Sequence, residues 1–246
     1  SIFILISYLL SANYQDMIGF ALVLSVGLIH GANDLLIIKK NSKSISNFSQ
    51  FRTFFAYIGV VFVGLIFFYL IPSFALITFI LVSIYHFGEQ HIQAIPITRK
   101  LRSNYRVISI VSHGIILFTI IFMNNIEVVN NVFLSFKINF LSSNTLNLTL
   151  IIASVLYMTT LVINKYLTSF IISEVLFFVL FYFLSLSSTL ILCFSVYFIF
   201  FHSILSIKDQ VKYIYGSNDT ISLKRYLLNS MPYFILALIF LILFYN

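Results

Sequence analysis

Residues 17–38 read MIGFALVLSVGLIHGANDLLII, an apolar run in which Asp34 is the only charged side chain. A helix rises about 1.5 Å per residue, so this run is long enough to cross about 30 Å of membrane hydrocarbon. The whole chain has the same character, because 61% of its 246 residues are hydrophobic and only 9% are charged. This composition is typical of an integral membrane protein and excludes a soluble domain.

The apolar runs lack the alternation of an outer-membrane strand, so helices are the predicted spanning elements. We predict an all-α, polytopic transmembrane helix bundle with about 8–9 spans, forming a single domain over residues 1–246. Residues 1–12 are interpreted as the end of a helix rather than a signal peptide, because they have no basic segment. The expected spans are 1–12, 17–38, 53–71, 73–95, 107–124, 147–163, 166–185, 187–207 and 229–245.

Three connections carry recognisable signals. Pro72 predicts a tight turn between two spans, and Gly216-Ser217-Asn218-Asp219 predicts the turn inside the segment 208–228. Residues 222–228 are amphipathic and are expected to lie on the membrane surface. Residues 125–146 form the longest connection on the opposite side.

The net charge of +7 is explained by topology, and no nucleic-acid partner is expected. The expected spans place thirteen of the fourteen basic residues on one side of the membrane, which the positive-inside rule makes cytoplasmic. We therefore predict a multi-pass protein of the cell inner membrane, with an anionic lipid leaflet as neighbour. The thirteen are Lys39, Lys40, Lys43, Arg52, Arg99, Lys100, Arg102, Arg106, Lys165, Lys208, Lys212, Lys224 and Arg225, and Lys137 lies opposite.

Five histidines lie inside these apolar runs or within a turn of their ends. Ionisable groups at membrane depth are costly and usually functional. Four of the five are expected roughly 7–14 Å from the cytoplasmic helix ends, at about 1.5 Å per residue, so four helices each place an imidazole in one layer. The four are His30, His86, His113 and His202, and His91 is expected to be shallower.

This layer predicts a shared metal or proton site. The one cysteine, Cys193, excludes a thiolate cluster, and a set of imidazoles suits iron(II), copper or zinc. The chain lacks the His-Glu-x-x-His motif of zinc hydrolases and the histidine boxes of membrane desaturases. Bis-histidine haem and simple interhelical hydrogen bonding are the alternatives. An open iron centre in an apolar bundle suits oxygen chemistry on a lipid-soluble substrate. The better candidate ligands are His30, His86 and His202, and His113 is a weaker candidate.

Two acidic residues are expected to orient these ligands. Asp34 follows His30 by four residues and Glu89 follows His86 by three, so each pair shares a helix face. Carboxylates in such positions commonly fix the tautomer of a metal-bound imidazole. Gly31 is expected to permit close approach of a helix or a ligand.

Other side chains near the histidines allow a substrate pocket. Tyr85, Phe87 and Phe201 are candidates for its apolar wall. Glu174, by contrast, is interpreted as an ordinary helix-end charge.

Three motifs occur in order: His30-Gly-Ala-Asn-Asp34, Tyr85-His86-Phe87-Gly88-Glu89 and Phe201-His202-Ser203. Together they resemble the Brp/Blh family of membrane β-carotene 15,15'-dioxygenases, which are associated with rhodopsins. The resemblance covers most of the chain. It implies a non-haem iron(II) enzyme that splits the central double bond of β-carotene with O₂ and releases two all-trans-retinal molecules.

The resemblance also implies residue roles. His30, His86 and His202 match the family's iron ligands. Family members commonly have another histidine four residues after the late one, where this chain has Ser206. Either His113 or His91 supplies a fourth ligand, or three histidines suffice, or activity has been lost or redirected.

Two other functions remain as alternatives. The first is a non-catalytic carotenoid- or retinal-binding accessory protein of a rhodopsin system, with a degenerate iron site marked by Ser206. The second is a transporter or proton relay, which predicts internal repeats that the sequence does not show. The expected partners of the enzyme are β-carotene, O₂ and the lipid bilayer, with a functional link to a retinal-binding rhodopsin.

Overall fold

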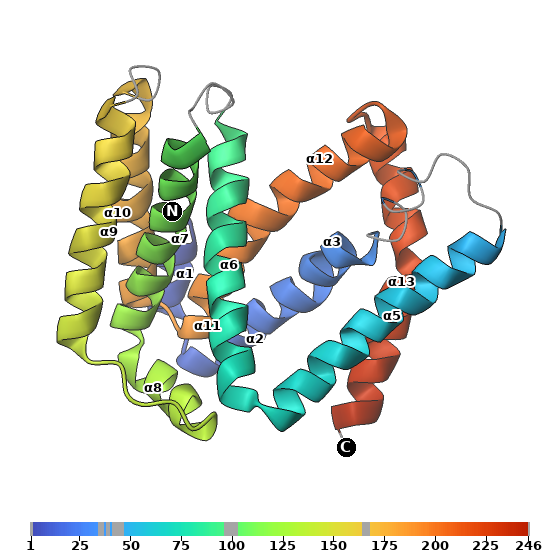
Figure 1. The fold of residues 1–246 in the computed structure, drawn as a ribbon, viewed down its shortest axis with the longest axis horizontal. Helices are drawn as coiled ribbons and strands as arrows, with labels where there is room; N and C mark the ends of the chain where they lie inside the picture. The colour runs from blue at the N-terminus through green and yellow to red at the C-terminus, as the bar shows by residue number, and fades with distance from the viewer. Residues whose placement is uncertain are drawn as a thin grey trace. The chain divides into compact units, whose positions relative to one another are not determined.

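The computed structural model describes residues 2–33, 37, 40, 47–95, 103–163 and 168–245. Every regular element in these ranges is helical, as predicted (Figure 1). Two segments, η1 and η4, are π-helical, and η3 is a short 3-10 helix. The elements are α1 (Ile2–Leu9), α2 (Ala12–Leu22), η1 (Val23–Gly27), α3 (Leu28–Ala32), α5 (Asn47–Leu70), α6 (Pro72–Ala94), α7 (Ser103–Asn124), α8 (Ile126–Ser135), α9 (Ser143–Ile163), η3 (Thr168–Phe170), α10 (Ile171–Ser187), α11 (Leu190–Tyr197), η4 (Phe198–Ser203), α12 (Ile204–Tyr215) and α13 (Thr220–Tyr245).

Six helices of the described chain are long and apolar enough to cross a membrane, which agrees with a multi-pass membrane protein. The predicted count of 8–9 spans is not confirmed. The other expected spans fall on α1, which has only eight residues, and on α5 and α13, whose side chains are described in part. The six are Ala12–Gly31, Pro72–Ala94, Asn104–Asn124, Ser143–Ile163, Thr168–Ser187 and Leu190–Tyr215.

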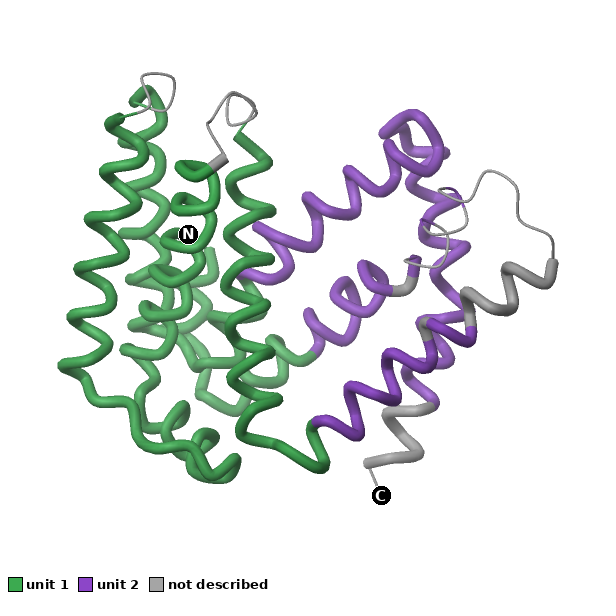
Figure 2. The backbone as a smooth tube through the Cα atoms, in the orientation of Figure 1, with its two compact units in different colours: residues 1–20, 68–196 green, residues 21–67, 197–246 purple. Residues whose placement is uncertain are grey.

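The described chain divides into two compact units, coloured in Figure 2. Unit 1 comprises residues 1–20 and 68–196, and unit 2 comprises residues 21–67 and 197–246. Each unit is described by itself below, and the single domain stays a prediction.

Helix α7 is the centre of unit 1, where it packs against both α6 and α9. A larger share of its residues is buried than in the other candidate spans. Polar side chains join it to its neighbours, since Ser109 donates a hydrogen bond to Thr160 on α9 at 2.9 Å. Ser185 of α10 donates to the carbonyl oxygen of Ile120 on α7 at 3.2 Å. Such interhelical bonds contribute on average about 0.6 kcal/mol each in a membrane.

Two glycines bring α6 and α7 into backbone contact. A Cβ atom on Gly88 would lie 2.0 Å from the carbonyl oxygen of Ile110, and one on Gly114 would lie 2.0 Å from that of Ile84. Close approach of this kind is the usual role of small residues between membrane helices. The expected close approach at Gly31 is not found among the described atoms, since none lies within 4 Å of a Cβ built there.

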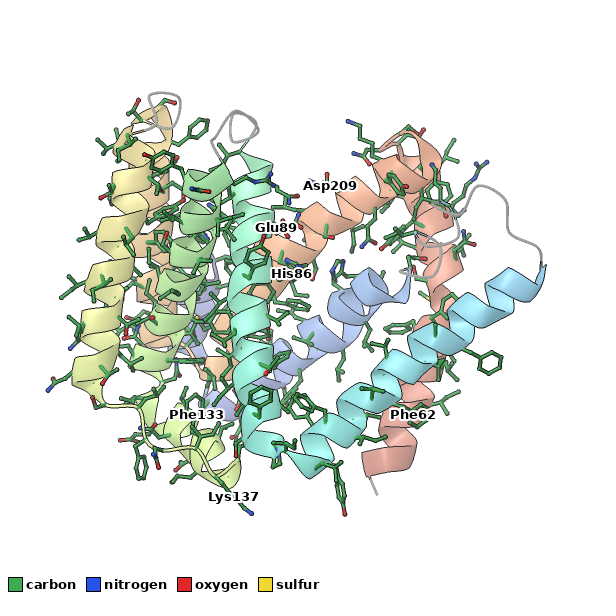
Figure 3. The ribbon with its side chains drawn as sticks, in the orientation of Figure 1. Phe62, His86, Glu89, Phe133, Lys137 and Asp209 are labelled. Carbon is green, nitrogen blue, oxygen red and sulfur yellow. The ribbon has the colours of Figure 1, made fainter. Side chains whose placement is uncertain are left out.

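Helix α8 lies inside the segment 125–146, which was expected to be only a connection. Val129 and Phe133 are one turn apart and both are buried, so this short helix packs its apolar face against the protein. Lys137 follows it, at the lower end of unit 1 in Figure 3. Ser73 donates a hydrogen bond to the carbonyl oxygen of Phe136 at 2.6 Å, which places Lys137 beside the start of α6. The turn predicted at Pro72 is confirmed, with proline as the first residue of α6.

In unit 2, residues expected to form loops are helical. Residues 208–215 continue α12, because Ile207 and Val211 lie one turn apart and are buried with Tyr226 of α13. Residues 222–228 lie in the first turns of α13, and Tyr226 among them is fully buried, while their location on the membrane surface stays a prediction.

The predicted turn between α12 and α13 is confirmed. Gly216 adopts a left-handed conformation with φ of 84°, which ends α12 in the manner usual for glycine. Asp219 then accepts a hydrogen bond from the backbone N–H of Ser222 at 2.7 Å and acts as the N-cap of α13. This bond, together with one from Ser217, lowers the pKa of the Asp219 carboxyl.

The α6–α7 contact supplies a stability prediction. Gly88→Ala forces a methyl group into the Ile110 backbone, so we expect the free energy of unfolding to fall by about 1–3 kcal/mol, the usual cost of overpacking. Thermal unfolding in detergent, followed by circular dichroism, measures the change. Gly64→Ala is the matched control, because no described atom lies within 4 Å of a Cβ built there. Equal melting temperatures for the two variants would contradict the close contact.

Candidate metal centre

Two of the predicted ligands, His30 and His202, lie side by side in unit 2. Their ring centres are 5.1 Å apart and the ring planes are perpendicular. His202 is 1% exposed and His30 is half-buried. The two residues are 172 positions apart in the chain, so this contact depends on the packing of α3 and η1 beside η4.

Both histidines are associated with π-helical segments. Residues 23–27 form η1 directly before the short helix that carries His30, and η4 contains His202. The two segments pack against each other at Gly27, where a Cβ atom would lie 2.8 Å from Cε1 of Phe198. The Phe198 ring in turn stacks on His202, with ring centres 5.5 Å apart and planes inclined by 17°. Single-turn π-helical insertions occur frequently at functional sites.

Helix α13 packs against α3 and supports the same region. The Tyr226 hydroxyl donates to Gln210 at 2.5 Å and makes a longer bond of 3.5 Å to the carbonyl oxygen of His30. The Asn33 side chain, fully buried, donates to the hydroxyl of Ser230 at 2.6 Å. These bonds hold the backbone at His30 and the side chain of Asn33 against α13.

The geometry of this pair fits two ligands of one metal ion. Metal–nitrogen bonds of about 2.1 Å place the ring centres of two neighbouring imidazole ligands about 5 Å apart. The observed 5.1 Å agrees with that separation. Imidazole is a suitable ligand for iron, copper and zinc.

The other predicted ligand-site residues belong to unit 1, to α12 or to the part of the chain outside the described residues. His86 and Glu89 follow one another along α6 in unit 1, with His86 exposed and Glu89 half-buried (Figure 3). Asp34 lies outside the described residues. Ser206 is half-buried on α12, one turn after His202.

The three predicted wall residues differ in their surroundings. Phe87 is 5% exposed and stacks on Phe118, with ring centres 5.9 Å apart, so it packs in the core of unit 1. Tyr85 is 42% exposed and Phe201 is 37% exposed. Contact of these residues with a substrate stays a prediction.

A second group of metal-ligating side chains lies inside unit 1. Nε2 of His91 is 3.1 and 3.0 Å from the two oxygens of Glu174, and Nδ1 of His113 is 3.9 Å from Oε2. The rings of His91 and His113 stack with centres 3.8 Å apart. One ligand atom from each of the three residues lies within 4.8 Å of the other two. Tyr157 donates a hydrogen bond of 2.7 Å to Oε2 of Glu174.

The interpretation of Glu174 as an ordinary helix-end charge is wrong. It does occupy the first turn of α10, but it is 5% exposed and bonded to His91. A buried carboxylate at membrane depth needs a partner, and the position of Glu174 eight residues after the start of the expected span 166–185 was the available signal. The contact between His91 and Glu174 was not predicted, because the two residues are 83 positions apart and His91 was expected at a shallower depth.

A family model described as beta-carotene 15,15'-dioxygenase matches residues 21–246. The chain belongs to this β-carotene 15,15'-dioxygenase family. The match confirms the resemblance drawn from the three histidine motifs. No curated protein and no solved structure matches the chain.

The region shared with the β-carotene 15,15'-dioxygenase family contains all five histidines and both groups of ligating side chains. It begins two residues before η1, so the helical segments that carry His30 and His202 both lie within it.

The hydrogen bond between Tyr157 and Glu174 supplies a second prediction. Tyr157→Phe leaves a buried carboxylate oxygen with one donor fewer, so we expect metal-stripped protein to lose about 1–3 kcal/mol of unfolding free energy. Thermal unfolding in detergent measures the loss. Tyr69→Phe is the matched control, because Tyr69 is 86% exposed. A melting temperature no lower than that of the control would contradict the bond.

Proposed function

We propose that this protein is a non-haem iron(II) dioxygenase that cleaves the central double bond of β-carotene with O₂ and releases two all-trans-retinal molecules. The family match over residues 21–246 carries the proposal. The adjacent imidazoles of His30 and His202 support it, because neutral imidazoles with open coordination positions suit iron(II).

His30, His86 and His202 are the proposed iron ligands, with His86 assigned by the resemblance alone. The stacking of His113 on His91, and its place beside Glu174, favour a different role for His113. Three histidines are therefore the proposed set, with Ser206 in the position of the family's further histidine. Bound iron(II) would supply the activation of O₂.

The overall reaction needs no general acid from the protein. One carbon–carbon double bond is replaced by two carbonyl groups, and the two oxygen atoms of O₂ end in the two aldehydes. Proton donors are not required for this balance, which agrees with a ligand set of neutral imidazoles. The protein would hold the ligands and exclude water from the site. The Phe198 ring, which stacks on His202, would contribute to both tasks.

β-Carotene dissolves in the bilayer, so it would reach the protein from the lipid. Tyr85 and Phe201 offer exposed aromatic surface to such a substrate, whereas Phe87 would position the neighbouring His86 from the core. The retinal product is the chromophore class that a rhodopsin binds, which is the basis for the proposed functional link.

The ligand assignment predicts the effect of single substitutions. We expect His30→Ala and His202→Ala each to abolish retinal formation by the purified protein and to lower its iron content. Retinal is measured by chromatography and iron by elemental analysis. The control is Asn229→Ala in α13, an exposed residue whose side chain donates a hydrogen bond to the Tyr215 hydroxyl at 2.7 Å.

Full activity in both histidine variants would overturn the assignment. Wild-type protein that retains β-carotene without cleaving it, and carries no iron, would favour the accessory protein instead.

The contact at Gly27 predicts a weaker effect through packing. Gly27→Ala displaces the Phe198 ring and with it His202, at a cost of about 1–3 kcal/mol. We expect iron affinity to fall about 5–140-fold, because 1.4 kcal/mol corresponds to a factor of ten. Titration of metal-stripped protein with iron(II) under anaerobic conditions measures the affinity. Gly64→Ala again serves as control, and equal affinities would contradict a role for the η1–η4 contact.

A further inference from the structure

Three helices of unit 1 bring two imidazoles and a carboxylate together in the protein interior. His91 is on α6, His113 on α7 and Glu174 on α10. His113 is fully buried, and the exposed fractions of the side chains of His91 and Glu174 are 15% and 7%. None of the three is among the proposed iron ligands.

The distances from the histidine nitrogens to the carboxylate fit the ligand sphere of one cation. Two ligand atoms bound to the same ion at about 2.1 Å lie about 3.0–4.2 Å apart, depending on the angle at the metal. The separation of His91 Nε2 from Glu174 Oε2 is 3.0 Å, and that of His113 Nδ1 from the same oxygen is 3.9 Å. Both values lie inside the range for ligands of one ion. The stacked rings of His91 and His113, whose centres are 3.8 Å apart, would turn apart toward the separation of about 5 Å when both bind the ion.

His113 supplies an independent reason for a ligand at this place. Neither of its ring nitrogens has a hydrogen-bond partner among the described residues, although the ring is 0% exposed. A buried polar group without a partner costs about 1–3 kcal/mol. Its Nδ1 faces Glu174 at 3.9 Å, which is too long for a hydrogen bond but suitable for two ligands of one ion.

A proton and a metal ion would give bonding partners to different side chains of this group. A proton on His91 would strengthen its bond to Glu174 but would leave His113 without a partner. A divalent cation satisfies a nitrogen of each histidine and the carboxylate together. Two histidines and one carboxylate are a common ligand set for iron(II) and zinc in enzymes.

We propose that His91, His113 and Glu174 form a second metal site, which binds a divalent transition-metal ion and ties α6, α7 and α10 together. His91 binds through Nε2, His113 through Nδ1 and Glu174 through a carboxylate oxygen.

Neighbouring residues position these ligands and keep the site dry. The Tyr157 hydroxyl holds Glu174 Oε2 at 2.7 Å, in the manner of a residue that orients a ligating carboxylate. Phe177 stacks on His113 with ring centres 5.8 Å apart, and Phe178 lies 5.0 Å from the same ring. The aromatic walls limit competition by water for the ligand positions.

The site is tested in a chain that lacks two of the proposed iron ligands, His30→Ala/His202→Ala. The protein is stripped with a chelator, loaded with Co²⁺, freed of excess ion and measured for bound cobalt by elemental analysis. We expect about one Co²⁺ per chain, with the visible absorption of a cobalt ion bound by nitrogen and oxygen ligands. Absence of bound cobalt from this variant overturns the proposal.

Glu174→Gln, added to the same chain, removes the charged ligand with almost no change in shape. We expect it to lose the bound cobalt, and retention of one Co²⁺ also overturns the proposal. Circular dichroism checks that this variant is folded, and if it is not, the cobalt content of the parent chain decides alone.

Tyr157→Phe in the same parent chain separates a positioning residue from a ligand. We expect the number of bound ions to stay the same and the affinity to fall about 10–100-fold, as is usual for residues that orient a metal ligand. An unchanged affinity overturns this positioning role. Retinal formation does not enter these measurements, so the metal site and the proposed function can fail independently.

Discussion

Membrane hydrocarbon offers no hydrogen-bond partner to a polypeptide, and the described structure meets this constraint with helices throughout. The same constraint acts on polar side chains, and several of those described bond across helices. Gln15 accepts from the backbone N–H of Thr189 and donates to the carbonyl oxygen of Ser7, joining α2 to α1 and to the start of α11. Ser195 similarly donates to the carbonyl oxygen of Gly19 at 3.0 Å. These buried side chains thus have partners on neighbouring segments of unit 1.

The histidines gain their significance from that constraint. Small residues allow the helices that carry them to approach closely, as at Gly88 and Gly114 in unit 1 and at Gly27 in unit 2. The approach at Gly27 brings two π-helical segments together beside His30 and His202. In both units, therefore, close helix packing and the grouping of imidazoles occur in the same elements.

Much of this was accessible from the sequence. Apolar runs and their turns predicted an all-helical membrane protein, because length and composition alone decide whether a helix suits a bilayer. The ordered motifs around His30, His86 and His202 indicated the family. The neighbours of Glu174 could not be predicted from the sequence, since His91 and His113 come from other helices and only packing brings the three residues together. The π-helical segments also escaped prediction, because hydrophobic periodicity does not distinguish one extra residue in a turn.

The central claim is that this chain cleaves β-carotene at its central bond, and its expression in cells that accumulate β-carotene tests that claim most directly. The colour of the cells and the carotenoid products in their extracts are measured together, with an empty vector as control. The proposed function predicts loss of colour and two molecules of retinal for each β-carotene consumed. Undiminished β-carotene, or cleavage products of unequal length, would contradict it.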